Sequence, residues 1–403
     1  MKPVTAMRAL LSPDRPLNHP HRLAALIAVV YVALALLTSS RIPPFESADE
    51  GPHLLVSDHI ARTGTLPVIA SRAEIAAMAA AGDVIGQWSI ESHQPPLYYA
   101  LGALLIAPTE RADLTDYLRS NPLIFVRGER AGNANVWLHD PRPPQGDTHI
   151  ALWILRGYSL VLSTLTLGLI YYGGRLATGS AAVGLTAMFT VAGLHTFASI
   201  GAAVNNDNLV TLLYSAGVVL MLRAWRDGLR WPLIAALSAV LTAIALTKIT
   251  GLALFAIVYG ALALGVYRGR FSPRQAALTV LITGVSAVLL AGWWYVRNWT
   301  LYGDPIASAA TQALWGRSFA RPDESGDLIG EIVRVWRSFW FMTGHLHQPV
   351  YAPPLYYAVT TATAALGLLG WMLPRRPRLD RDTGLILGAA ALLPVILLAA
   401  GTL

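Results

Sequence analysis

The sequence predicts an all-α polytopic membrane protein, and three observations carry that prediction. Apolar residues make up 54% of the chain and charged residues only 13%, about half the charged share of a typical soluble domain. The apolar residues recur in runs of about 17–22, roughly the length that a helix needs to cross the hydrocarbon layer. The strict alternation of a membrane barrel strand is absent from the sequence. Because lipid cannot satisfy backbone polar groups, we expect the spans to be helices.

Nine spans follow from these runs. They cover residues 23–40, 153–172, 180–200, 208–222, 231–247, 250–267, 276–296, 353–373 and 383–403. The first run is too long for the apolar part of a signal peptide, and Arg41-Ile-Pro-Pro44 after it is no small-residue cleavage site. We therefore expect the first span to remain as an anchor.

Basic residues in the short loops predict the orientation of the chain. With the N-terminus inside, the cytoplasmic segments hold 15 Lys and Arg against four acids. They carry a net charge of +11, and the outer segments carry −4, which accounts for the overall +7. The basic balance therefore reflects topology in a cell membrane, and no nucleic-acid partner is expected. The lack of cysteine excludes disulfides and thiolate metal sites.

Two long loops, 41–152 and 297–352, fall on the outer side and are expected to form caps on the membrane surface. In the first loop, Gly51-Pro52 and Pro95-Pro96 are typical helix starts. Ser71 with Glu74 three residues later has capping-box spacing. In the second loop, the apolar residues that follow Ser325 share one helical face, which predicts a helix lying in the interface.

This organisation divides the chain into four parts. They are a cytoplasmic head (1–22), a membrane module (23–305, including the outer loop 41–152), a second outer loop with an interfacial helix (306–352) and a C-terminal transmembrane hairpin (353–403).

The strongest chemical feature follows the first span directly. Glu46, Asp49, Glu50 and His53 place three carboxylates and one imidazole within eight residues, just before a helix start. Such a group suits either general-base chemistry or the binding of a hard divalent cation. The alternative interpretation is a solvated acidic loop beside the membrane.

Five further groups fall on the same predicted face, although the orientation was deduced without them. They are Glu91-Ser-His93-Gln94 before two prolines, Asn205-Asn206-Asp207-Asn208 at the end of the third span, Lys248 between two spans, Arg297 in a Trp- and Tyr-rich segment, and His345-Leu-His347. Taken one at a time, a helix-start turn, an N-cap, a snorkelling lysine, an aromatic belt and a polar loop would explain them. A lysine between apolar spans is a functional hypothesis by default, with a phosphate or a carboxylate as its expected partner. The convergence on one face favours a real site.

An ordered set of motifs over residues 20–305 gives a family resemblance. The motifs are PFESADEGPH (44–53), HQPPLYY (93–99), RGYSLVLS (156–163), NND (205–207), ALTKITG (245–251) and WWYVRNWTLYGDP (293–305). In these residues the chain resembles the GT-C superfamily of integral membrane glycosyltransferases. The resemblance is to the polyprenyl-phosphate-dependent branch, which includes protein O-mannosyltransferases and the aminoarabinose transferases that modify lipid A.

The resemblance implies a GT-C-like bundle and a mechanism. A polyprenyl-phosphate-linked sugar would lie with its phosphate near Lys248 and Arg297 and its tail between spans. Asp49 and Glu50 would be the catalytic acids, with Asp49 as general base for an inverting attack by an acceptor glycan, lipid or protein. Residues implied in substrate positioning are Glu46, His53, His93, Gln94, Asn206 and Asp207.

The resemblance also leaves alternatives open. A divalent cation, Mg or Mn rather than Zn, is a candidate cofactor, with Asp49, Glu50, His345 and His347 as candidate ligands. Gln94 stands where relatives often have a basic residue, and the chain ends at Leu403 inside an apolar run. A transporter or flippase of a lipid-linked substrate is a second hypothesis, but the spans carry almost no charge near their centres. A non-catalytic scaffold is a third, and it predicts that Asp49 points away from Lys248.

Overall fold

The computed structural model describes residues 19–81, 89–122, 135–140, 145–315, 328–342, 350–372 and 379–399. These residues form helices joined by loops and no β-strand. In chain order the helices are α2 (Pro20–Arg41), α3 (Glu50–Thr63), α4 (Arg72–Ala80), η1 (Ser89–His93), α6 (Leu97–Ile106), α7 (Leu114–Tyr117), α8 (Asp147–Thr178), α9 (Ala181–Ala192), α10 (His195–Gly201), α11 (Asp207–Asp227), α12 (Trp231–Ala245), η2 (Ile249–Leu252), α13 (Ala253–Tyr267), α14 (Pro273–Tyr302), α15 (Ser308–Trp315), α16 (Leu328–Trp340), α17 (Pro354–Met372) and α18 (Arg381–Ala399).

Every predicted span falls on a helix, and the prediction of an all-α multi-pass membrane protein is confirmed. Among the described residues, five helical segments are long and apolar enough to cross a bilayer: α2, α8, α11, η2 with α13, and α14. The bent pair α9 and α10 makes a sixth if it is counted as one span, and α12 is shorter at 15 residues. The total of nine spans therefore stays a prediction.

The predicted span 180–200 is not one straight helix. It breaks at Gly193 and Leu194, and the two halves, α9 and α10, are bent by 72°. Leu194 has extended backbone angles, and its carbonyl accepts the Ala198 N–H to begin the new helix. The apolar run hides this break because glycine and leucine both belong to apolar spans, so hydropathy alone cannot locate it.

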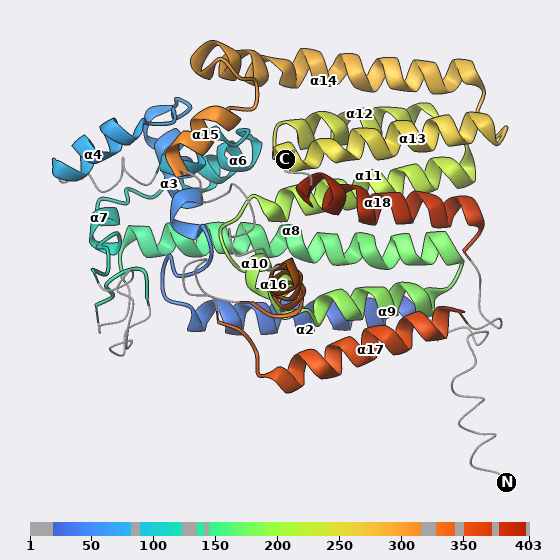
Figure 1. Ribbon diagram of the computed structural model, residues 1–403, viewed down its shortest axis with the longest axis horizontal. Coiled ribbons are helices and arrows are strands. Elements are labelled where there is room, and N and C mark those ends of the chain that lie inside the picture. The colour runs from blue at the N-terminus through green and yellow to red at the C-terminus, as the bar shows by residue number, and fades with distance from the viewer. Residues whose placement is uncertain are drawn as a thin grey trace, which may run out of the picture.

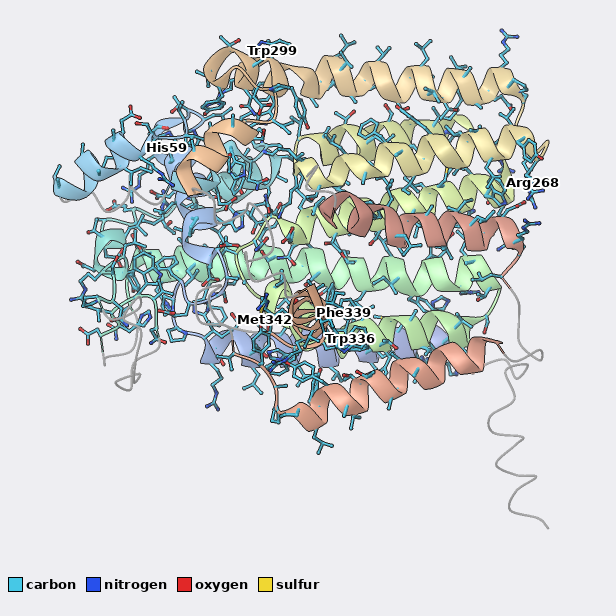
Figure 2. All side chains as sticks on the ribbon, in the orientation of Figure 1. His59, Arg268, Trp299, Trp336, Phe339 and Met342 are labelled. Carbon is cyan, nitrogen blue, oxygen red and sulfur yellow. The ribbon has the colours of Figure 1, made fainter. Side chains whose placement is uncertain are left out.

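The long helices lie side by side, and the helices of the first outer loop gather at one end of the bundle together with α15 (Figure 1). We call this the capped end. Figure 2 places Arg268, one of the basic short-loop residues, at the opposite end from His59 of α3. At least one loop that is predicted to be cytoplasmic therefore lies at the end of the bundle opposite the capped end.

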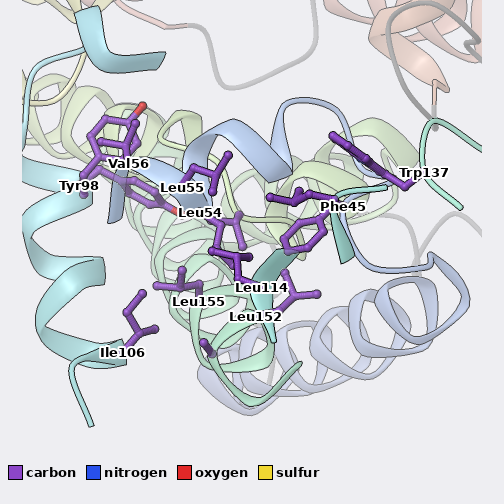
Figure 3. Packing of buried hydrophobic residues seen from close by; sticks show 14 of the residues in the cluster. Phe45, Leu54, Leu55, Val56, Tyr98, Ile106, Leu114, Trp137, Leu152 and Leu155 are labelled. Atoms are coloured by element: carbon purple, nitrogen blue, oxygen red, sulfur yellow. The ribbon is translucent and has the colours of Figure 1, made fainter. Parts of the chain in front are cut away.

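The caps share a hydrophobic core with the spans (Figure 3). Phe45 and Leu54 from the first outer loop pack in one cluster with Tyr98 of α6 and with Leu152 and Leu155 of α8. All five side chains are almost completely buried. Burying such side chains stabilises the fold by roughly 1.5–3 kcal/mol each. The outer loop is thus packed onto the bundle and positions its polar residues rigidly.

The short helices begin close to their predicted starts. Ser71 and Glu74 make the reciprocal capping-box bonds at the start of α4, with N···O distances of 2.7 and 3.3 Å. Helix α6 follows Pro95-Pro96 as predicted and has ten residues. Helix α16 lies roughly perpendicular to the spans, because Figure 1 shows it nearly end-on while the spans run across the view.

Candidate active site

Asp49 and Glu50 are neighbours in the sequence but point into different surroundings. Asp49 is the N-cap residue of α3 and has left-handed backbone angles, φ 58° and ψ 8°. Aspartate adopts this region more readily than most non-glycine residues. The turn leaves Asp49 half-buried, whereas Glu50 enters the core and is 0% exposed.

Glu50 forms a two-pronged ion pair with Arg156 of α8. Arg156 Nε donates to Oε1 at 2.8 Å and Nη2 donates to Oε2 at 2.7 Å. The backbone N–H groups of Phe45 and Val204 also donate to the same carboxylate. A buried pair of charges is tolerated when its remaining hydrogen-bonding sites are filled in this way. Glu50 therefore joins the outer loop to α8 and to the loop between α10 and α11, and this geometry does not fit the predicted catalytic or metal-binding role.

Glu46 is also occupied. Its carboxylate accepts the backbone N–H groups of Val136 and Trp137 at 2.9 Å, and it pairs with His139 Nε2 at 2.8 Å. These bonds attach residues 135–140 to the start of the outer loop. Glu46 thus supports the cap, and its predicted contact with substrate does not fit its 7% exposure.

Lys248 lies where α12 gives way to η2. Its Nζ donates to Asp207 Oδ1 at 2.6 Å, and the two side chains remain 20% and 41% exposed. The break is held at the capped end, because Leu97 N–H at the start of α6 donates to the Leu246 carbonyl at 2.8 Å. This pair is therefore open to solvent on one side, in contrast to the pair of Glu50 and Arg156.

Two further carboxylates act on Lys248. Partial burial lowers the pKa of the ammonium group, but Asp207, Glu91 and Asp49 outweigh that effect and the pKa of Lys248 is raised. Asp49 thus acts on Lys248 electrostatically. We call Asp49, Glu91, Asp207 and Lys248 the open cluster.

His53 borders the open cluster from α3. Burial lowers the pKa of His53, although Glu91 and Asp49 oppose that effect. Its Nδ1 lies 2.8 Å from Tyr99 Oη, and Asn206 Nδ2 donates to the same oxygen at 3.2 Å. Since Tyr99 accepts from Asn206, its own proton is available for Nδ1. This pattern assigns the ring proton of a neutral His53 to Nε2.

Two buried side-chain acceptors near these groups have no hydrogen-bond partner among the described residues: Gln94 Oε1 and Asn206 Oδ1. The Gln94 amide nitrogen lies 3.1 Å from His93 Nε2, so its oxygen is directed elsewhere. A buried acceptor without a partner costs roughly 1–3 kcal/mol. Gln94 Oε1, on a half-buried side chain, is therefore a candidate acceptor for a ligand hydroxyl, whereas the predicted substrate contact of Asn206 does not fit its 0% exposure.

Arg297 does not join the open cluster through any of its contacts. Its Nη2 donates to the carbonyls of Leu66 and Pro67 at 3.3 and 2.8 Å, and its guanidinium stacks over Trp294 at 4.9 Å. Arg297 therefore ties α14 to the loop that follows α3. The predicted pairing of Arg297 with Lys248 around one phosphate does not fit these contacts.

The candidate metal ligands do not form a site in the part of the chain that the structure describes, where no group of three or more His, Asp or Glu side chains could hold an ion. Both oxygens of Glu50 are held by Arg156. His345 and His347 lie outside the described residues.

Two large apolar clefts lie away from the open cluster. One cleft, with a volume of about 510 Å³, lies between α13 and α18. The other, with a volume of about 630 Å³, lies between α16 and α17. Neither cleft is lined by a residue of the open cluster. The candidate site is therefore a polar surface at the capped end.

Comparisons with known proteins give matches among solved structures and none in sequence. No family model matches the chain, and no curated protein matches it in sequence. Among solved structures, the chain is similar to the protein O-mannosyltransferase Pmt1-Pmt2 complex of S. cerevisiae bound to the sugar donor, with 15% identity and a TM-score of 0.46. The match covers 72% of this chain and 35% of the yeast chain. The chain thus corresponds to about a third of that relative.

Proposed function

We propose that this protein is a membrane glycosyltransferase that moves a sugar from a polyprenyl-phosphate carrier to an acceptor hydroxyl on the non-cytoplasmic side. One observation carries the proposal: at the capped end Lys248 pairs with Asp207 at 2.6 Å, partly open to solvent, and Asp49 and the buried Glu91 act on Lys248 electrostatically. The short basic loops include Arg268 at the opposite end (Figure 2). The positive-inside rule then supports an outward-facing cluster.

In this proposal Asp49 is the general base. It is half-buried at a helix start and acts electrostatically on Lys248 and His53. The acceptor hydroxyl attacks the anomeric carbon, its proton passes to Asp49, and the bond between that carbon and the phosphate oxygen breaks. The leaving group is polyprenyl phosphate, and a single in-line displacement inverts the anomeric centre.

Lys248 supplies positive charge for the departing phosphate. Its raised pKa keeps it protonated at neutral pH, but in the free protein its charge is balanced by Asp207. The donor phosphate would therefore compete with Asp207 for Lys248. A released Asp207 carboxylate is then an acceptor for sugar hydroxyls, and Gln94 Oε1 adds another acceptor.

A divalent cation is not needed in this scheme. The described carboxylates do not form a ligand set, and Glu50 is held by Arg156. Each proposed step therefore uses only side chains of this protein. Arg297 and Glu50 act as positioning residues in the scheme, because their contacts hold the cap and do not reach the open cluster.

The test uses purified protein in lipid nanodiscs with a radiolabelled polyprenyl-phosphate sugar and, in parallel, a nucleotide sugar. We expect release of polyprenyl phosphate and transfer of label from the lipid-linked donor only. Asp49→Asn should lower transfer by at least about 100-fold, within the usual contribution of a general base. Asp116→Asn, at an exposed acid of α7, serves as the matched control and should retain wild-type transfer. Full transfer by Asp49→Asn would overturn the proposal.

A further inference from the structure

Helix α16 presents a cation to an apolar groove. Its residues Ile332, Val335 and Phe339 are exposed and apolar, and Trp336 and Phe339 are labelled on this helix in Figure 2. The helix is attached to the bend before α10. Thr196 Oγ1 donates to the Ser338 carbonyl at 2.7 Å and accepts the Met342 N–H at 3.0 Å. Helix α16 is thus held across the bundle with its apolar side chains outward.

Arg337 of α16 is stacked between two tyrosines. Its guanidinium carbon lies 4.3 Å from the ring centre of Tyr351 and 5.2 Å from that of Tyr357. The Tyr357 hydroxyl is fixed, since it donates to the Phe341 carbonyl at 2.9 Å and accepts the Ala352 N–H at 3.0 Å. The rings therefore hold the guanidinium in a defined place.

The charge of Arg337 is not neutralised by any carboxylate of the described residues. Every ion pair found among the described residues is formed by side chains other than Arg337. The buried Nε of Arg337 also has no hydrogen-bond partner among the described residues. An arginine held between aromatic rings without an acidic partner retains its planar set of donors. Such a fork matches the oxygens of a phosphate.

The groove beside Arg337 is long and apolar, with a volume of about 630 Å³. Its lining residues are Val333, Trp336 and Arg337 of α16 and Pro354, Tyr357, Ala358, Thr361, Ala362 and Ala365 of α17. On α17 these residues form one face from Pro354 to Ala365, about 16 Å at roughly 1.5 Å per residue. The Arg337 guanidinium lies near the Pro354 end of this face, over Tyr357. Further along α17 the groove is lined by the small side chains of Ala358, Ala362 and Ala365.

We propose that Arg337 and this groove bind an anionic phospholipid. The phosphate would lie on the guanidinium, and one acyl chain would occupy the face of α17 between Tyr357 and Ala365. Charge complementarity favours an anionic headgroup over a zwitterionic one, and tryptophan and tyrosine at the groove are typical of the membrane interface. The site is separate from the open cluster and does not depend on sugar transfer.

Native mass spectrometry of the detergent-purified full chain tests this proposal. The probes are phosphatidylglycerol and phosphatidylcholine with identical acyl chains. Wild-type protein should retain phosphatidylglycerol preferentially, and Arg337→Gln should weaken its binding by about tenfold or more and remove the preference over phosphatidylcholine. The matched control is Arg334→Gln, which removes one charge from the same helix outside the groove and should keep the preference.

A second variant addresses the acyl chain. Ala362→Trp should fill the groove and displace phosphatidylglycerol with Arg337 intact. An unchanged preference in Arg337→Gln, or an equal loss in Arg334→Gln, would overturn the proposal. Displacement of phosphatidylglycerol by an equimolar polyprenyl phosphate would also overturn it, because the groove would then belong to the sugar carrier.

Discussion

Two ion pairs near the capped end differ in almost every physical respect. Glu50 and Arg156 are nearly inaccessible, joined by two bonds, and surrounded by backbone donors and carbonyl acceptors. Asp207 and Lys248 share one bond, and their side chains are 41% and 20% exposed. The first pair has no hydrogen-bonding capacity left for a ligand, whereas the second can exchange its partner.

The difference shows how one short acidic motif provides both support and chemistry. Asp49 and Glu50 differ by one position, and the left-handed angles of Asp49 send the two carboxylates apart. Glu50 anchors the loop to α8, and this anchor positions Asp49 within the open cluster. A residue's access to solvent therefore separates the two roles better than its residue type does.

The largest expected effect is a loss of stability on removing one member of the buried pair. Glu50→Gln leaves Arg156 buried with its charge uncompensated, which should cost about 3–5 kcal/mol of unfolding free energy. Thermal unfolding in detergent, followed by tryptophan fluorescence, measures this change. Asp116→Asn is the exposed control and should stay within about 0.5 kcal/mol of wild type. A similarly small change for Glu50→Gln would show that the two pairs do not differ in this way.

The second prediction concerns how the free energy of unfolding depends on pH through His53, the buried side chain that borders the open cluster. Because burial lowers the pKa of His53, the unfolded chain binds a proton more readily below the ordinary histidine pKa of about 6.5. Stability should therefore fall as the pH drops from 7 toward 5, by at most about 1.4 kcal/mol per pH unit for this group. Unfolding temperatures of wild type and His53→Gln at several pH values provide the measurement. If both proteins show the same dependence on pH, His53 is not the group responsible.

The smallest expected effect is the coupling within the open pair. Asp207→Asn, Lys248→Met and the double variant form a cycle whose interaction energy should be about 0.5–1 kcal/mol, as for partly exposed pairs. The same unfolding assay supplies the four stabilities. A coupling energy of about 3 kcal/mol or more would contradict this prediction, because Asp207 and Lys248 would then stabilise the fold as strongly as Glu50 and Arg156 do.

Much of the fold could be predicted because membrane spans are determined by local composition. The apolar runs located helices from α2 to α18, and Ser71 with Glu74 located a cap. The break at Gly193 could not be found in this way, since it depends on backbone angles within a continuous apolar run.

The open cluster was only partly predictable. The sequence marks Lys248 because a charge between apolar spans is costly, and it marks Asp49 and Asp207 through the acidic and amide-rich motifs that contain them. The burial of Glu50 could not be predicted, because its partner Arg156 lies 106 positions further on and no local pattern links them. Glu91 was noticed only as part of a proline-flanked turn, and the role of Tyr99 depends on contacts with His53 and Asn206 that appear only in the folded chain.

The most direct measurement of the central claim uses the absence of cysteine from the chain. Three single-cysteine variants are compared. Asp207→Cys reports on the open cluster, Ser159→Cys on a buried position of α8, and Gln275→Cys on the opposite end of the bundle. They are treated in intact cells with a membrane-impermeant maleimide. We expect labelling of Asp207→Cys at once, of Gln275→Cys only after permeabilisation, and of Ser159→Cys only after denaturation. Labelling of Asp207→Cys that requires permeabilisation would contradict the account, because the cluster would then face the cytoplasm.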